Sequence, residues 1–239
     1  VTVVDGNCGA LDAVLSGETH LYNDRADAFL VGGGEALTEI LYAAFRKLDV
    51  LADDGRTFAP GHAHSQGMRL GEGAAYLCLE KRAFALARGA RIHGEIVGYG
   101  SAFEAPASEA LLVHVSSDAI SRAIRMALEE AQLSAEDIDV VASAQSGLAA
   151  FDAAELRGIR ALVPDAPIAA PKAIFGETFG AGGALAMTCA LAWLAGAPVA
   201  PLVQGQTGQL KAPLHHVLVL AVGYYGNASA VVMRKHQAP

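Results

Sequence analysis

Asn7 and Cys8 stand side by side in the opening stretch VTVVDGNCGALDAV, where a strand pattern gives way to a helical one. A cysteine at the start of a helix is a candidate nucleophile, because the backbone N–H groups there favour a thiolate over a thiol. A thiolate could hold a covalent intermediate during group transfer. The alternative, which we prefer, is that Cys8 is a small core residue beside the helix.

Two further pairs of ionisable residues have informative spacings. Asp152 and Glu155 are three residues apart ahead of a helical pattern, which is the spacing of a capping box. Helix capping therefore explains both carboxylates without a catalytic role. Lys172 and Glu177 are five residues apart, and we expect the lysine to orient the carboxylate in a neutral pair.

The sequence predicts neither a metal nor a cofactor. His62 and His64 lie two apart in a polar loop, with no third ligand within sequence reach. The glycine-rich stretches VGGGEAL and FGAGGALA lack the spacing and the following acidic residue of a dinucleotide-binding loop, so close packing explains them better. Cys78 and Cys189 fall in apolar patterns and are predicted to be core residues.

Composition and charge narrow the function classes. The formal charge is −8 with no cluster of lysines and arginines, which argues against a nucleic-acid surface. The cysteines are too far apart for a disulfide framework, so we expect a reducing compartment, the cytoplasm. The longest apolar run, 187–203, is broken by Gly196, Pro198 and Pro201, and favours a buried helix over a membrane span.

Hydrophobic periodicity predicts an α/β protein with two successive β-α series. The expected strands are 1–4, 28–31, 74–79, 92–99, 138–141, 217–222 and 230–233. The expected helices are 11–21, 37–45, 81–88, 117–131, a segment capped at Asp152 and ending at 162, and 180–195. Residues 52–67 are polar and rich in turn formers, which predicts a long surface loop.

The segment RLGEGAAYLCLEKRAFALARGARIHGEIVGYGS, at 69–101, resembles the ketosynthase family, the condensing enzymes of fatty-acid and polyketide synthesis. The same resemblance is carried by RADAFLVGGGEA at 25–36, EEAQLSAEDIDVV at 129–141, PKAIFGETFGAGGALA at 171–186 and GYYGNASAVV at 223–232. It covers nearly the whole chain.

The resemblance implies a thiolase-like fold, in which two similar α/β halves form five α-β-α-β-α layers, usually in a dimer. Residues 1–90 would be the remainder of the N-terminal half and 91–239 the C-terminal half. The first part of the N-terminal half is absent from this chain, so its strands must come from a separate polypeptide, from further sequence, or not at all. In a family dimer the strand at 1–4 would lie against the partner subunit.

Active family members hold the growing acyl chain on a cysteine in an A-C-x-S-G context. Counting back without a gap from Ala26 and Asp27, which match the family, places Asn7 at that position. The letters NCGALDAV also resemble chain-length factors, the partner subunits of type II ketosynthases, in which the cysteine is replaced and the next residue is alanine. Cys8 then takes that alanine position, and only a one-residue gap would return it to the nucleophile position.

The family's two histidines, in N-A-H-G-T and K-S-x-x-G-H, donate hydrogen bonds to the developing enolate. The matches at Asp152 and Glu155 place Ala144 at the first histidine, and a methyl group cannot donate a hydrogen bond. The retained Lys172 places Glu177 at the second, where a carboxylate has the wrong charge for an enolate. The resemblance therefore implies that all three catalytic positions are altered.

The segment Gly223-Tyr224-Tyr225-Gly226 resembles the G-F-G-G segment that gates the acyl pocket in the family. Tyr225 stands where the family has a glycine, and we expect it to crowd the passage. A hairpin turn with two packing tyrosines explains the same residues equally well.

The sequence as a whole most resembles a chain-length factor of the type II polyketide or aryl polyene kind. That resemblance implies a degenerate subunit that forms a heterodimer with an active ketosynthase, meets acyl carrier protein through the complex and shapes the acyl tunnel. One alternative is an active synthase, or an acyltransferase or decarboxylase of modified mechanism, that uses Cys8. The other is a homodimeric binding protein without catalysis.

Overall fold

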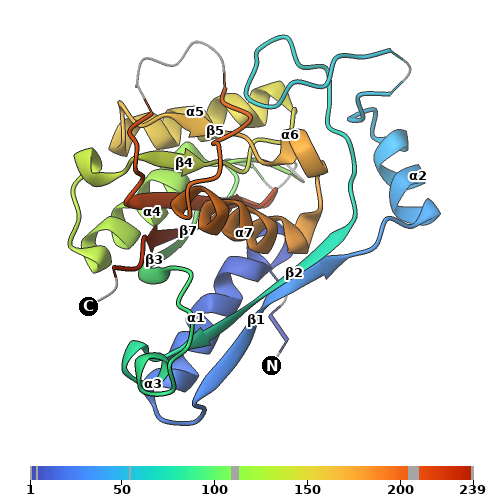
Figure 1. Ribbon diagram of the computed structural model, residues 1–239. Coiled ribbons are helices and arrows are strands. Elements are labelled where there is room, and N and C mark those ends of the chain that lie inside the picture. The colour runs from blue at the N-terminus through green and yellow to red at the C-terminus, as the bar shows by residue number, and fades with distance from the viewer. Residues whose placement is uncertain (1, 4, 54, 109–112, 204–209, 238–239) are drawn as a thin grey trace.

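The computed structural model describes the chain apart from residues 1, 4, 54, 109–112, 204–209 and 238–239 (Figure 1). The helices are α1 (Gly9–Tyr22), α2 (Glu39–Lys47), α3 (Arg82–Ala87), α4 (Ser117–Ala131), α5 (Ala149–Leu162), α6 (Lys172–Phe175) and α7 (Gly182–Leu194). The strands are β1 (Ala28–Glu35), β2 (Gly73–Glu80), β3 (Glu95–Phe103), β4 (Val140–Ala142), β5 (Ile168–Ala169), β6 (His216–Val222) and β7 (Asn227–Arg234). Short 3-10 helices cover Gly6–Cys8, Ala135–Asp137 and Phe179–Ala181.

The larger sheet has the strand order β3-β7-β6-β4-β5. Strands β3, β7 and β6 pair antiparallel, whereas β6, β4 and β5 pair in parallel. Parallel neighbours need a crossover connection, and α5 supplies the one between β4 and β5. The predicted hairpin of β6 and β7 is confirmed, with the tyrosine-containing segment as its turn.

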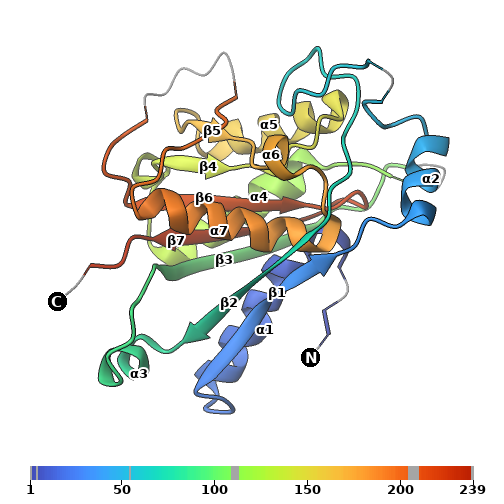
Figure 2. The ribbon, with the colours of Figure 1, turned by 45° about the vertical axis from the view of Figure 1, so that its right-hand side comes forward.

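Both faces of this sheet are buried. Val217 and Val219 of β6 belong to one core and Leu218 and Leu220 to the other, because successive side chains of a strand point to opposite faces. Helices α4 and α5 cover the leucine side, and α1 and α7 lie on the valine side (Figure 2). Helix α7 packs against both sheets, which explains why it is apolar on nearly all sides.

The smaller sheet pairs β1 with β2 antiparallel, with Leu30 opposite Cys78. Its inner face packs on α1, where Gly17 allows close approach: a Cβ there would lie 2.8 Å from Val31 Cγ1. In the described part of the chain its outer face is uncovered, and Leu30 and Tyr76 are 64% and 60% exposed. The layers are thus α4 and α5, the large sheet, α1 and α7, and the small sheet.

Most predicted elements are present with shifted ends, and β1 shows why. The strand predicted for 28–31 continues through Gly32, Gly33 and Gly34 to Glu35, where we expected a flexible turn. A Cβ on Gly33 would lie 2.2 Å from the carbonyl oxygen of Gly180. The glycines therefore serve close packing within an extended strand rather than chain reversal.

Two other predictions are wrong. Thr2 and Val3 belong to no strand, and residues 1 and 4 of that expected strand lie outside the described residues. A strand is defined by its hydrogen-bonded neighbour, and no described strand pairs with Thr2 or Val3. Cys78 is exposed rather than buried, because β2 alternates and this residue points to the uncovered face. Cys189, on α7, is only partly buried.

No helix among the described residues is both long enough and apolar enough to cross a membrane.

Candidate functional site

The start of α1 holds Asn7 and Cys8, both buried. Gly6 takes a left-handed φ of +52° and turns the chain into the 3-10 helix that leads to α1. The Cys8 thiol donates a 3.4 Å hydrogen bond to the carbonyl oxygen of Ala221. Burial first, and then the charges of Asp12 and Asp5, raise the pKa of Cys8 to about 12. The thiol is therefore neutral and enclosed, which is the environment of a structural cysteine.

Glu177 is held in place by its own backbone. Its N–H donates to the carbonyl of Arg69 at 2.7 Å, and its carbonyl accepts from the N–H of Gly71 at 2.9 Å. A Cβ on Gly71 would lie 1.9 Å from the carbonyl oxygen of Phe175, so this approach requires glycine. The segment after α6 is thus pinned beside residues 69–71, and the Glu177 side chain is fully buried.

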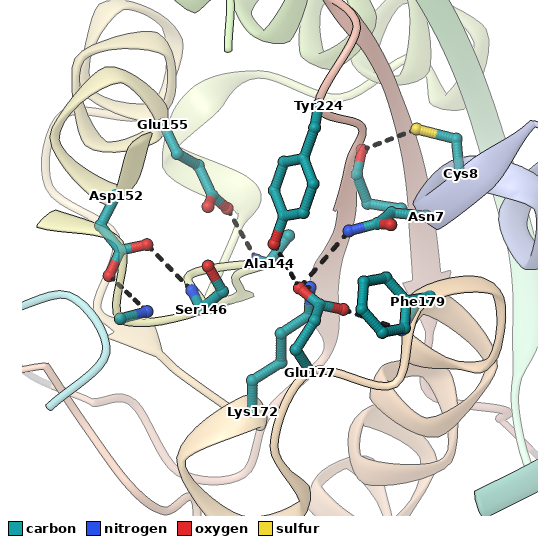
Figure 3. Close-up of polar contacts among 12 residues, drawn as sticks. Asn7, Cys8, Ala144, Ser146, Asp152, Glu155, Lys172, Glu177, Phe179 and Tyr224 are labelled. Carbon is teal, nitrogen blue, oxygen red and sulfur yellow. Dashed lines mark hydrogen bonds and ion pairs between the residues drawn. The ribbon is translucent and has the colours of Figure 1, made fainter. Parts of the chain in front are cut away.

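The carboxylate of Glu177 gathers donors from four places in the chain (Figure 3). Oε2 accepts from Lys172 Nζ at 2.7 Å, from the Tyr224 hydroxyl at 2.6 Å and from Asn7 Nδ2 at 3.4 Å. Oε1 accepts from the backbone N–H of Phe179 at 2.8 Å. The predicted pairing of Lys172 with Glu177 is present, and the structure adds Asn7 and Tyr224 to it.

The turn between β6 and β7 sends its two tyrosines in opposite directions. Tyr225 is 64% exposed, so the expectation that it crowds the passage is wrong. Tyr224 instead points inward, with its ring 5.5 Å from that of Phe151. Burial, and then the charge of Glu177, hold the pKa of Tyr224 well above its usual value. Sequence reasoning placed both tyrosines in the gate segment but did not predict that Tyr224 is the one that points inward.

Asp152 and Glu155 do not form a capping box, which corrects our expectation. Helix α5 begins earlier, at Ala149, so both residues lie inside it. Asp152 instead accepts backbone N–H bonds from Ser146 at 2.9 Å, from Gly147 at 3.0 Å and from Gly61 at 2.8 Å. It ties the loop after β4 to the long surface loop.

The carboxylate of Glu155 accepts a 2.7 Å hydrogen bond from the N–H of Ala144. Glu155 is buried, and burial raises its pKa to about 8. At neutral pH this carboxyl is therefore mostly protonated and positions the backbone at Ala144. The Ala144 methyl itself offers no proton to a reacting group.

Four of the residues singled out from sequence meet in one place. Asn7, Ala144 and Lys172 line a cavity of about 10 Å³. Glu177 does not line this cavity but accepts a hydrogen bond from Lys172. A space of that size holds about one water molecule, far below the hundreds of Å³ of a ligand pocket. Neither a cysteine nor a histidine is among the described residues that line it. The site therefore offers amide, ammonium and carboxylate groups, but no thiolate or imidazole.

No metal centre is found here. The described His, Cys, Asp and Glu side chains form no group of three that could bind an ion. The rings of His62 and His64 contact each other at a tilt of 56°, with their centroids 5.2 Å apart.

A second cavity, of about 480 Å³, lies along the small sheet and the start of α1. Leu30, Gly32 and Tyr76 line it on the sheet side, and Gly6 and Gly9 on the helix side. It opens next to the uncovered face of the small sheet, and it is the largest space that we describe near Asn7.

Sequence reasoning found Asn7, Ala144, Lys172 and Glu177 but missed the hydrogen bond from Tyr224 to Glu177. The two residues are 47 positions apart, and no local pattern links them. The available signal was the resemblance itself, since both residues lie in motifs attributed to one family.

Two family models match most of the chain. Residues 1–85 match the model described as "Beta-ketoacyl synthase, N-terminal domain", and residues 93–206 match "Beta-ketoacyl synthase, C-terminal domain". The chain belongs to the beta-ketoacyl synthase family. As a ketosynthase-family chain it has the mixed α/β thiolase-like fold that its motifs implied.

Curated relatives of this ketosynthase-family chain come from polyketide systems. It is 31% identical to the "Tetracenomycin polyketide synthase ketoacyl synthase beta subunit" of Streptomyces glaucescens, over 98% of this chain and 60% of the relative. It is 32% identical to the "Actinorhodin polyketide putative beta-ketoacyl synthase 2" of Streptomyces coelicolor, over the same shares. The chain thus spans about 60% of the length of these relatives.

The similar solved structures are also ketosynthases. A beta-ketoacyl synthase from Burkholderia phymatum superposes with a TM-score of 0.86 at 26% identity, over 98% of this chain and 61% of that one. The ishigamide ketosynthase/chain length factor superposes with a TM-score of 0.82 at 27% identity, over 99% and 60%. The chain is a ketosynthase-like protein related to the type II polyketide ketosynthases and chain-length factors.

Proposed function

We propose that this chain is a catalytically degenerate ketosynthase subunit of the chain-length-factor type. It pairs with an active ketosynthase, meets acyl carrier protein through that complex, and helps to shape the acyl tunnel. In this proposal Asn7 stands at the nucleophile position, and Ala144 and Glu177 stand at the two histidine positions. The proposal concerns binding and shape, because the chemistry belongs to the partner.

The observation that carries the proposal is the set of chemical groups present at the site. Condensation needs a thiolate to hold the acyl group and imidazole N–H groups to stabilise the enolate. The described residues that line the cavity beside Asn7 include neither a thiol nor an imidazole. The carboxylate of Glu177 already accepts hydrogen bonds from four donors. An oxyanion placed there would meet the Glu177 carboxylate, and the nearby donors of Asn7 and Lys172 are already directed at that carboxylate.

The rival function, an active enzyme that uses Cys8, finds little support. The Cys8 sulfur donates to Ala221, its pKa is raised to about 12, and it does not line the cavity beside Asn7. A thiol with that pKa is almost never a thiolate at neutral pH. It would have to leave its buried position before it could attack an acyl group.

The uncovered face of the small sheet supports the association part of the proposal. Leu30 and Tyr76 expose apolar surface beside the 480 Å³ cavity, and such patches mark places where other protein surface binds. Two relatives also bear on the partner. One similar solved structure is the ishigamide ketosynthase/chain length factor, and another is a type II acyl-carrier protein in complex with its ketosynthase.

Co-expression tests the proposal. The chain is produced with a cysteine-bearing type II ketosynthase, purified through a tag on this chain alone, and passed over a size-exclusion column. We expect one peak that contains both chains in equal amounts. Two independent peaks, with this chain as a homodimer, would favour a homodimeric binding protein and contradict the heterodimer.

A further inference from the structure

Tyr224 reaches from the surface of the protein to its most buried carboxylate. The residue is partly exposed at the turn between β6 and β7, but its hydroxyl donates a 2.6 Å hydrogen bond to Glu177, which is fully buried. Figure 3 shows the ring pointing toward Glu177 and Ala144. The Tyr224 side chain thus lies close to Asn7, because both donate a hydrogen bond to Oε2 of Glu177.

The backbone of the turn is anchored independently of this contact. The N–H of His114 donates to the carbonyl of Tyr224 at 2.9 Å, and the N–H of Gly226 donates to the carbonyl of His114 at 3.1 Å. The N–H of Glu104 donates to the carbonyl of Gly226 at 3.0 Å. Because the main chain is tied down, loss of the hydroxyl contact frees the Tyr224 side chain without releasing the turn.

The other end of the contact is also fixed. Glu177 has its backbone bonded to Arg69 and Gly71, and its carboxylate is held by Lys172 and by the N–H of Phe179. A hydrogen bond to a charged acceptor in the interior is among the stronger ones in a protein. Rotating Tyr224 away would break that bond and leave one donor fewer on a buried charge.

We propose that Glu177 acts as a latch that holds Tyr224 closed over Asn7, so that this chain admits no acyl group into its own pocket. Tyr224 is then the specificity-determining residue, and Glu177 positions it through the hydrogen bond. The inference rests on the proposed function in one respect, that Asn7 occupies the acyl-carrying position. The cavity of about 10 Å³ that Asn7 lines is far too small for an acyl group.

A cysteine placed at position 7 reports whether the pocket is open. The full chain carries Asn7→Cys in a Cys78→Ser background, which removes the exposed native thiol. It is treated with N-octyl iodoacetamide, and alkylation at position 7 is followed by peptide mass spectrometry. Tyr224→Phe and Glu177→Gln break or weaken the latch, Tyr224→Ala removes the ring, and Tyr225→Ala changes an exposed neighbour as the matched control.

We expect slow labelling of position 7 with the latch intact and with Tyr225→Ala. Tyr224→Phe and Tyr224→Ala should label faster by about tenfold to a hundredfold, the factor for one hydrogen bond to a charged group. Glu177→Gln should lie between, because the amide still accepts a hydrogen bond. Circular dichroism establishes that each variant is folded, and Tyr224→Phe carries the test if Tyr224→Ala is not.

Equal labelling rates in all variants would overturn the latch. Faster labelling in Tyr224→Ala but not in Tyr224→Phe would also contradict it, because the ring alone would then close the pocket and Glu177 would have no part. The labelling needs no partner chain. Its outcome therefore stands apart from the co-purification, and either proposal can fail while the other survives.

Discussion

Lys172 and Glu177 form a buried ion pair, with the lysine Nζ 2.7 Å from Oε2 of the carboxylate and both side chains at most 6% exposed. The lysine is the first residue of α6, and the glutamate is the second residue after the end of that short helix. Such a pair is costly to break from one side, because the remaining charge stays buried without its partner. Lys172 therefore has a structural reason to be present even where no reaction takes place.

The first prediction concerns that pair. Lys172→Met leaves the Glu177 carboxylate without a cation and should lower the free energy of unfolding by about 3–5 kcal/mol, measured by urea denaturation. Lys172→Met/Glu177→Gln removes both charges, keeps an acceptor for Tyr224, and should recover part of the loss. Lys81→Ala, which breaks an exposed pair with Asp24, is the control and should cost less than about 1 kcal/mol. A loss in Lys172→Met no larger than this control would be inconsistent with a buried pair.

The second prediction concerns the buried carboxyl of Glu155. Its pKa is raised to about 8 in the folded chain, so the native state binds its proton more tightly than the unfolded state, whose reference pKa is 4.5. This residue's contribution to stability is complete below about pH 4.5 and is lost as the pH rises to about 8.

Glu155→Gln keeps the acceptor for the N–H of Ala144 but cannot ionise. Its stability relative to the natural chain should therefore rise between about pH 4.5 and 8, and level off above that range. Urea denaturation at several pH values measures the difference between the two chains, which cancels the other titrating groups. A difference that does not change with pH would show that Glu155 is not the buried acid described here.

The third prediction concerns thiol reactivity. Cys78 is exposed on β2, whereas the Cys8 thiol is buried with its pKa raised to about 12. Iodoacetamide should therefore modify Cys78 first and leave Cys8 unmodified in the native chain, as read from peptide masses. After unfolding in urea both should react. Rapid modification of native Cys8 would instead favour the active-enzyme alternative.

The fourth prediction concerns the glycines of β1. Gly33→Ala places a Cβ against the carbonyl of Gly180 and should lower stability by about 1–3 kcal/mol through overpacking. Gly34→Ala is the matched control, because the nearest atom, Ala74 Cβ, lies at an ordinary 3.4 Å. It should be neutral or slightly stabilising. Equal losses in the two variants would argue against close contact between β1 and the 3-10 helix Phe179–Ala181.

Periodicity along the chain was enough to predict most of the large sheet and its helices. The hairpin of β6 and β7 and the amphipathic α4 follow from local patterns, because each buries a continuous face. The end of β1 could not be predicted, since the closeness of Gly33 to Gly180 depends on a contact 147 residues away in sequence (180 − 33). Cys78 was misjudged because no local pattern shows that one face of β2 is uncovered.

Part of the candidate site could likewise be predicted from the sequence, and part could not. Motif register placed Asn7, Ala144 and Glu177 together, and the spacing of Lys172 from Glu177 predicted their pairing. The capping box failed because α5 starts one turn earlier, which turns the Asp152 carboxylate onto loop N–H groups instead. The inward direction of Tyr224 depends on how the turn is anchored, and spacing alone does not reveal that.

The measurement that tests the central claim most directly is turnover by the purified complex of this chain with an active ketosynthase. Carrier-protein-dependent condensation is assayed with Cys8→Ala in this chain and, separately, with the partner's nucleophilic cysteine replaced by alanine. We expect Cys8→Ala to leave the rate unchanged and the partner replacement to abolish it. Loss of turnover in a folded, fully assembled Cys8→Ala complex would contradict the claim that this chain contributes shape rather than chemistry.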